Sequence, residues 1–187
     1  MTSREKILAA VRANQPYETP LPDVPDFGGD SSLDRFTAVL QGIGGQVVEV
    51  ADAARLDEVV RHLYPTARTV AAEVISATVA VTPETPIETL AAVDLAVLRG
   101  EFGVAENGAV WLPGANMLHR ALPVVSQHLA LVLRRADIVA TMHQAYARLG
   151  SVDSYGIFLA GPSKTADIEQ SLVIGAHGAR SLTVFLV

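Results

Sequence analysis

The sequence lacks cysteine and is poor in charged residues, aromatic residues and long apolar runs. Without cysteine, the chain of 187 residues can form no disulfide and can hold neither thiolate-bound zinc nor a thiolate-bound iron–sulfur cluster. Charged residues make up 18% of the chain and hydrophobic residues 50%, the opposite of the balance found in disordered chains. We therefore expect one folded domain of ordinary size, with a hydrophobic core that needs no covalent cross-link.

Extended basic and apolar segments are also missing. The net charge is −6 and no run of lysine and arginine offsets it locally, so nucleic acid is not an expected partner. The N-terminal segment carries Arg4, Glu5, Lys6 and Arg12 and lacks the apolar core of a signal peptide. The most apolar stretches have the length of strands rather than of membrane helices. We expect a cytoplasmic protein without a membrane span.

Proline is concentrated near the N-terminus, between two predicted helices. Ser3 can cap a helix that extends to about Ala13, and Ser31 can cap a second one. Residues 15–29 contain four prolines and end in two glycines, a composition that cannot continue a helix or a central strand. We therefore divide the chain into an N-terminal helix with a proline-rich arm, residues 1–30, and an α/β domain, residues 31–187. The arm either wraps the domain or reaches a neighbouring chain.

Apolar segments of strand length alternate with helical patterns through the rest of the chain. The expected strands span residues 46–50, 94–98, 129–133, 155–160 and 182–187, and the expected helices span residues 33–43, 52–63, 138–149 and 165–175. This alternation predicts an α/β fold with a mostly parallel sheet flanked by helices. The dipeptide Asn107-Gly108, between two short apolar segments, predicts a hairpin and hence a small antiparallel part.

The clearest pattern for ligand binding is a predicted strand–loop–helix over residues 155–175. An apolar strand leads into the Gly161-Pro162 turn, and hydroxyl and ammonium groups follow where the helix should begin. Helix N-termini bind anions because their free N–H groups and the helix dipole favour negative charge, so a carboxylate or phosphate would fit. The residues expected to bind it are Gly161, Ser163, Lys164, Thr165, Asp167 and Glu169. The alternative is that a hydroxyl caps the helix and the acids merely favour its dipole.

Two further sites could carry chemistry. His177 precedes Gly178 near the last expected strand, with Arg180 close by, and could act as an acid, a base or an anion donor. Glu106 stands at the predicted hairpin tip and could act as a nucleophile or a base. Each has a structural alternative: a helix-end turn for His177, and a solvated turn neighbour for Glu106. The remaining histidines show no metal-ligand spacing, so no metal site is expected.

The C-terminal part resembles a known family. Residues 161–169, GPSKTADIE, followed by residues 172–182, LVIGAHGARSL, look like the C-terminal signature of the LutC/YkgG proteins, the LUD-domain family. Residues 103–112 fit the middle block of that family, which has an acid followed by a small turn. The N-terminal helix and the proline-containing arm agree more loosely.

This resemblance implies a fold, a function and partners. The fold would be similar to the NagB/RpiA/CoA-transferase group. Family members act with two iron–sulfur partner proteins in the oxidation of L-lactate to pyruvate, and this chain would be a non-catalytic or co-catalytic subunit. It would bind a small carboxylate or phosphate and carry no cofactor, since the clusters would reside in the partner subunits. Homo-oligomerisation is left open.

The same fold group implies an alternative activity. Class I CoA-transferases carry a Ser-Glu-Asn-Gly motif whose glutamate becomes acylated, and this chain has Ala105-Glu106-Asn107-Gly108. The alternative function is therefore acyl transfer through Glu106, although Ala105 departs from the motif. A third hypothesis is an interaction module whose proline-rich arm docks on a partner.

Overall fold

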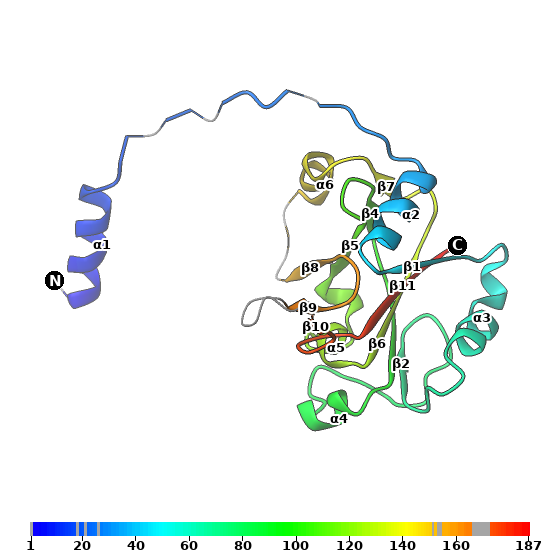
Figure 1. The fold of residues 1–187 in the computed structure, drawn as a ribbon. Coiled ribbons are helices and arrows are strands. Elements are labelled where there is room, and N and C mark those ends of the chain that lie inside the picture. The colour runs from blue at the N-terminus through cyan, green and yellow to red at the C-terminus, as the bar shows by residue number, and fades with distance from the viewer. Residues whose placement is uncertain are drawn as a thin grey trace.

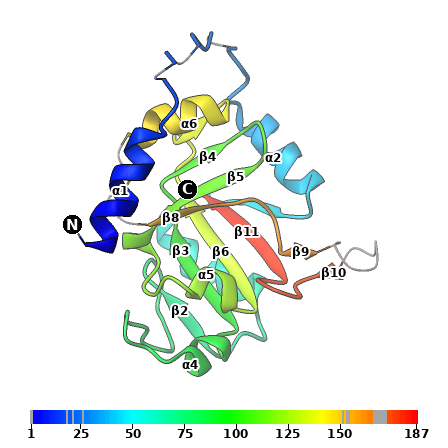
Figure 2. The ribbon, with the colours of Figure 1, turned by 90° about the vertical axis from the view of Figure 1, so that its left-hand side faces the viewer.

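A parallel sheet forms the centre of the protein. The computed structural model describes residues 2–17, 19–20, 22–25, 27–150, 152, 155–165 and 173–187. The sheet has the order β1-β11-β6-β3-β2, and every neighbouring pair is parallel. Strands β11, β6, β3 and β2 lie side by side in Figure 2. Their bounds are β1 Gln46–Glu49, β2 Val70–Ala72, β3 Leu95–Arg99, β6 His128–Leu133 and β11 Ser181–Leu186.

The central strands are buried on both faces, which explains their continuous apolar sequences. In β6, Leu129, Leu131 and Leu133 belong to one core cluster, and Ala130 and Val132 belong to another. Successive side chains of a strand point to opposite faces, so a strand covered on both sides must be apolar at every position. The two clusters are the two layers of core on either side of the sheet.

Helices cover each face of this sheet. On one face, α3 (Leu56–Leu63) follows the short 3-10 helix η1 (Ala53–Arg55) and buries Leu56 and Val60. On the other face lie α2 (Leu33–Gly42), α4 (Ile87–Ala91) and α5 (Leu122–Val125), whose buried residues share one cluster. Figures 1 and 2 show these helices around the sheet.

A second, smaller sheet packs beside the first. It has the order β7-β4-β5-β8, with antiparallel pairs β4–β5 and β5–β8 and a parallel pair β4–β7. Its strands are β4 Phe102–Val104, β5 Ala109–Pro113, β7 Ile138–Val139 and β8 Gly156–Leu159, and a short 3-10 helix, η2 (Gly114–Asn116), follows β5. Helix α6 (Met142–Leu149) packs on it through Ala145. The predicted fold class, a mostly parallel sheet flanked by helices with a small antiparallel part, is confirmed.

The predicted helix over residues 165–175 is wrong at both of its described ends. Lys164–Thr165 forms β9, which pairs antiparallel with β10, Val173–Ile174. Tertiary hydrogen bonds override the local helical pattern here, because Ser163 N donates to Ala179 O and Gly175 N donates to Ser163 O. The expected strand 155–160 exists as β8, but it belongs to the antiparallel sheet.

The expected helix 138–149 begins later than its pattern suggests. Residues 138–139 form β7, and the helix starts at Met142 after Thr141, whose hydroxyl accepts from Gln144 N. The apolar pair Ile138-Val139 fits the helical pattern, but β-branched residues of this kind suit a strand as well.

The N-terminal helix α1 (Ser3–Ala13) has the predicted position, but its cap is Thr2, in a capping box with Glu5, and not the expected Ser3. The cap of α2 is likewise Ser32 and not Ser31. It buries no residue and stands away from the domain in Figure 1. The arm meets the domain near its end, where the ring of Phe27 lies 5.5 Å from that of His143 on α6. The division at residue 30 stays a prediction.

Asp137 joins the two sheets. Its carboxylate accepts from Arg148 Nη2 of α6 at 2.7 Å and from Arg134 Nε at 2.6 Å, just after β6. Its backbone carbonyl accepts from Gly103 N of β4 at 2.8 Å. These hydrogen bonds, first that of Arg148 and then that of Arg134, hold the pKa of the Asp137 carboxyl below its usual range.

Replacing Asp137 by Asn removes the charge that both guanidinium groups bind. We expect the free energy of unfolding to fall by about 2 kcal/mol, measured by urea unfolding at neutral pH. Because the folded pKa is lowered, the contribution of Asp137 is present above the ordinary aspartate pKa and is lost as pH falls through the folded pKa. The difference between the two proteins should therefore shrink below about pH 4.

The matched control is Asp57→Asn, which breaks an exposed helical pair with Arg61 and should change stability little. An equal decrease in the free energy of unfolding in the two variants would contradict the role of Asp137 in joining the two sheets.

Candidate functional site

A cavity of about 240 Å³ lies beside Ser163 and His177. It is lined by the end of β8 with the following Gly161–Ser163 turn, by the His177–Ala179 turn, and by the start of α5 with Pro123 and Val124. Leu129 of β6 and Leu182 of β11 complete the lining. The structure thus brings together three residues that the sequence singled out, Gly161, Ser163 and His177. The cavity lies near the amino ends of the parallel strands, because β11 begins at Ser181.

Two glycines allow the turns around Ser163 to approach closely. Gly161 has φ +72°, and a Cβ there would lie 3.0 Å from Ile43 O. A Cβ on Gly178 would lie 2.9 Å from the Cβ of Ser163. Glycine at position 161 thus lets its turn lie against Ile43 at the end of α2, and glycine at position 178 lets the His177 turn lie against Ser163.

A second hollow of about 350 Å³ adjoins the first and adds a residue that sequence reasoning missed. The two cavities share Val124, His177 and Gly178. Ser126, which lines the second, is 1% exposed, and its hydroxyl has no hydrogen-bond partner among the described residues. Buried polar groups are nearly always paired, so this hydroxyl is available to a ligand or a water molecule. A lone serine after an apolar helix gives no sequence signal.

The other residues predicted to bind an anion are placed differently. Lys164 Nζ donates to the carbonyl of Ile43 at the end of α2, so its charge is not directed to Ser163. Thr165 lies in β9, and no helix N-terminus forms at either residue. Asp167 and Glu169 lie outside the described residues. The predicted anion site therefore has no helix N-terminus at Lys164 or Thr165.

Glu106 and His177, the two predicted catalytic residues, lie in different settings. Glu106 is exposed in the turn between β4 and β5, and its Oε2 accepts from Met142 N at 2.8 Å. Its carboxylate thus faces the first turn of α6, where a negative charge favours the helix dipole. Glu106 does not line either cavity beside His177.

Arg180 lines neither of the two cavities beside His177, and its positive charge acts on His128 instead. Its backbone N donates to Gln127 O, and its side chain is exposed. Next to it, His128 Nδ1 lies 2.7 Å from Ser181 Oγ, across the β6–β11 pair. Burial first, and then the positive charge of Arg180, lower the pKa of His128, while Asp94 opposes them. His128 is therefore neutral at physiological pH.

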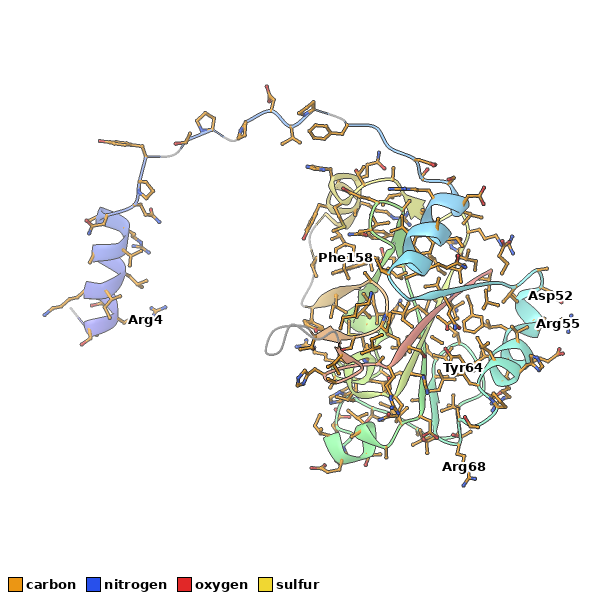
Figure 3. All side chains as sticks on the ribbon, viewed as in Figure 1. Arg4, Asp52, Arg55, Tyr64, Arg68 and Phe158 are labelled. Carbon is orange, nitrogen blue, oxygen red and sulfur yellow. The ribbon has the colours of Figure 1, made fainter. Side chains whose placement is uncertain are left out.

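The ring of Tyr64, at the end of α3, lies 5.5 Å from that of His128. The Tyr64 hydroxyl is 2.7 Å from Thr183 Oγ1 of β11. Tyr64 is labelled in Figure 3. This polar row at the amino edge of the sheet satisfies side chains that would otherwise be buried without partners.

The described residues support neither a metal site nor a membrane-spanning helix. In the described part of the chain, no group of three or more histidine and acidic residues is arranged to hold a metal ion. Over the same residues, no helix has the length and apolar character to cross a membrane.

Replacing Arg180 by Gln should raise the pKa of His128, because it removes a like charge. This pKa is measured by following the imidazole resonances of His128 by NMR as the pH is varied. The control variant is Arg61→Gln on α3. The lowered pKa also means that the folded state resists protonation, so stability falls as pH drops below the ordinary value of about 6.5. That loss should be smaller in Arg180→Gln. An unchanged His128 titration would contradict the influence of Arg180.

Comparison with known proteins places this geometry in a family. The family model of the LUD domain matches residues 86–187, which contain both cavities. A protein named lactate utilization protein C from an Exiguobacterium species is 30% identical over 179 residues, covering 83% of this chain and 77% of that protein. Its namesake from Shouchella clausii is 32% identical over 98 residues, covering 49% of this chain and 43% of that protein.

Two further proteins are similar to this chain. The uncharacterized protein YkgG of Escherichia coli is 32% identical over 89 residues, covering 44% of this chain and 38% of that protein. The crystal structure of a DUF162 family protein from Deinococcus radiodurans superposes with a TM-score of 0.61 at 18% identity, covering 83% of this chain and 95% of that one. At that identity it supports the fold alone. Together with the family model, these matches confirm the resemblance to the LutC/YkgG proteins: the chain belongs to the LUD domain family.

Proposed function

We propose that this chain is a component of a lactate-utilization system. The observation that carries the proposal is the 30% identity, over 83% of the chain, to a protein named lactate utilization protein C. The similarity covers most of both proteins rather than one motif. The family model of the LUD domain independently matches residues 86–187, which contain the cavities beside Ser163.

The chain acts as a non-catalytic or co-catalytic subunit beside iron–sulfur partner proteins. Oxidation of L-lactate to pyruvate removes two electrons and two protons, which an acceptor must take up. A chain without cysteine has no thiolate ligands for a cluster that could carry those electrons. The division of labour thus assigns electron transfer to the partners, and substrate binding or assembly to this chain.

A small anion binds in the cavity beside Ser163 and His177. Ser163 offers a hydroxyl, His177 an imidazole, and Ser126 a buried hydroxyl in the adjoining hollow. Hydroxyl donors bind carboxylate or phosphate oxygens without a helix N-terminus. This site replaces the one predicted from helix polarity, and it keeps three of the expected residues, Gly161, Ser163 and His177.

Acyl transfer through Glu106 is the alternative function. Glu106 is exposed, so an acyl donor has access to it. The carboxylate would have to leave the N–H of Met142 before it could attack a thioester. The structure gives this glutamate a capping role, so the alternative rests on the motif alone.

Affinity purification under anaerobic conditions, from the native host grown on L-lactate, tests the assembly. We expect cysteine-rich iron–sulfur proteins to co-purify with the tagged chain, identified by mass spectrometry. The tag expressed alone is the control. Recovery of the chain without such proteins would contradict the assembly, and normal growth of a deletion strain on L-lactate would contradict the role itself.

Replacing Ser163 by Ala tests the anion site. We expect the dissociation constant for L-lactate or inorganic phosphate, measured by calorimetry, to rise about five- to tenfold, because a net hydrogen bond is worth about 1 kcal/mol. Ser76→Ala, in an exposed loop, is the matched control. Equal affinity in the two variants would place the anion elsewhere.

A further inference from the structure

A third cavity, of about 390 Å³, lies at the opposite edge of the parallel sheet. It is lined by Arg99 at the end of β3, by Val132 and Arg134 at the end of β6, and by Val187 just after β11. In α/β proteins, ligands bind beyond the carboxyl ends of the parallel strands. This cavity occupies that position, whereas Ser163 and His177 lie near the amino ends. We call it the carboxyl-edge cleft.

The cleft combines an apolar lining with a cationic side chain. Leu56, Val74, Val132 and Val187 supply apolar surface. Arg99 is exposed, and its side chain has no hydrogen-bond or ion-pair partner among the described residues. Ligand sites are typically apolar pockets with a few polar groups that fix orientation. An apolar body with one anionic end matches this combination.

The charges around the cleft favour a ligand that carries a single negative charge. Asp137 lines it, but its carboxylate is already bound by Arg134 and Arg148. Arg99 therefore supplies the available positive charge, while Glu101, which also lines the cleft, repels a second negative charge. A guanidinium binds a carboxylate through two parallel hydrogen bonds. A monocarboxylate fits these charges better than dianionic phosphate.

The remaining lining residues are fixed by the fold. Asn116 Nδ2 donates to the backbone carbonyl of Arg99 at 2.9 Å, which ties the η2 turn to the end of β3. Ala53 and Leu56 lie at the start of η1 and α3, whose position Figure 3 marks with Asp52 and Arg55. The positive end of the α3 dipole therefore lies beside the cleft and favours an anion there.

We propose that the carboxyl-edge cleft binds an organic monocarboxylate, with the carboxylate on Arg99 and the alkyl chain on the apolar lining. The inference does not depend on the lactate-utilization role or on the Ser163 cavity. It assigns a second ligand site to the other edge of the same sheet.

Calorimetric titration of the full chain with acetate, butyrate and hexanoate tests the inference. Affinity should rise about three- to fourfold for each methylene that enters the cleft, because each adds buried apolar surface. Inorganic phosphate, as the competing anion, should bind at least tenfold more weakly than hexanoate at this site. Replacing Arg99 by Gln should raise the hexanoate dissociation constant about tenfold, because a charge-assisted hydrogen-bonded pair is lost.

Two control variants make the outcome decisive. Arg12→Gln removes the same charge from α1, which buries no residue, and should leave hexanoate binding unchanged. Ser163→Ala separates the two cavities: a loss of hexanoate binding in that variant without a loss in Arg99→Gln would move the ligand to the Ser163 cavity and overturn the inference. Unaltered thermal unfolding of Arg99→Gln shows that the variant folds. No binding of hexanoate, affinity independent of chain length, or equal affinity in Arg99→Gln would each overturn the proposal.

Discussion

The pairing of β6 with β11 is the constraint on which the other parts of the molecule depend. The two strands match over six residues, from Ser181 with His128 to Leu186 with Leu133. They are buried on both faces, so their backbone groups can be satisfied only by neighbouring strands. This pairing fixes the amino edge, where the parallel strands begin, and the carboxyl edge, where they end. The second sheet is attached at the carboxyl edge, because Asp137 binds Arg134 after β6 and Arg148 of α6.

The two edges provide different chemistry. At the amino edge, hydroxyl and imidazole groups come from Ser163, His177 and Ser126 and meet where turns pack closely. At the carboxyl edge, Arg99 and several apolar side chains line one cleft. The region that the LUD family model matches includes residues from both edges.

Sequence reasoning succeeded where a single strand or helix decided the structure. Continuous apolar segments identified β3, β6 and β11, and the Asn107-Gly108 turn identified the β4–β5 hairpin. It failed at residues 165–175. Hydroxyls, acids and the preceding Lys164 indicated the start of a helix, but the described ends of the segment are strands. The hydrogen bonds from Ser163 to Ala179 and from Gly175 to Ser163 link residues that no local pattern connects. Ser126 and Arg99 were missed because isolated residues carry no periodic signal.

The sequence by itself determined the fold class, the cysteine-free chemistry and the family, because composition, strand-length apolar segments and local motifs are properties of neighbouring residues. Only the tertiary structure decided which functional groups share a site. It placed Ser163 with His177 in one cavity and brought Arg99 to an apolar cleft. It also hydrogen-bonded Lys164 to the carbonyl of Ile43, and Glu106 to the N–H of Met142. The physical reason is that strand order and the close approach of turns at Gly161 and Gly178 depend on contacts between residues far apart in the chain.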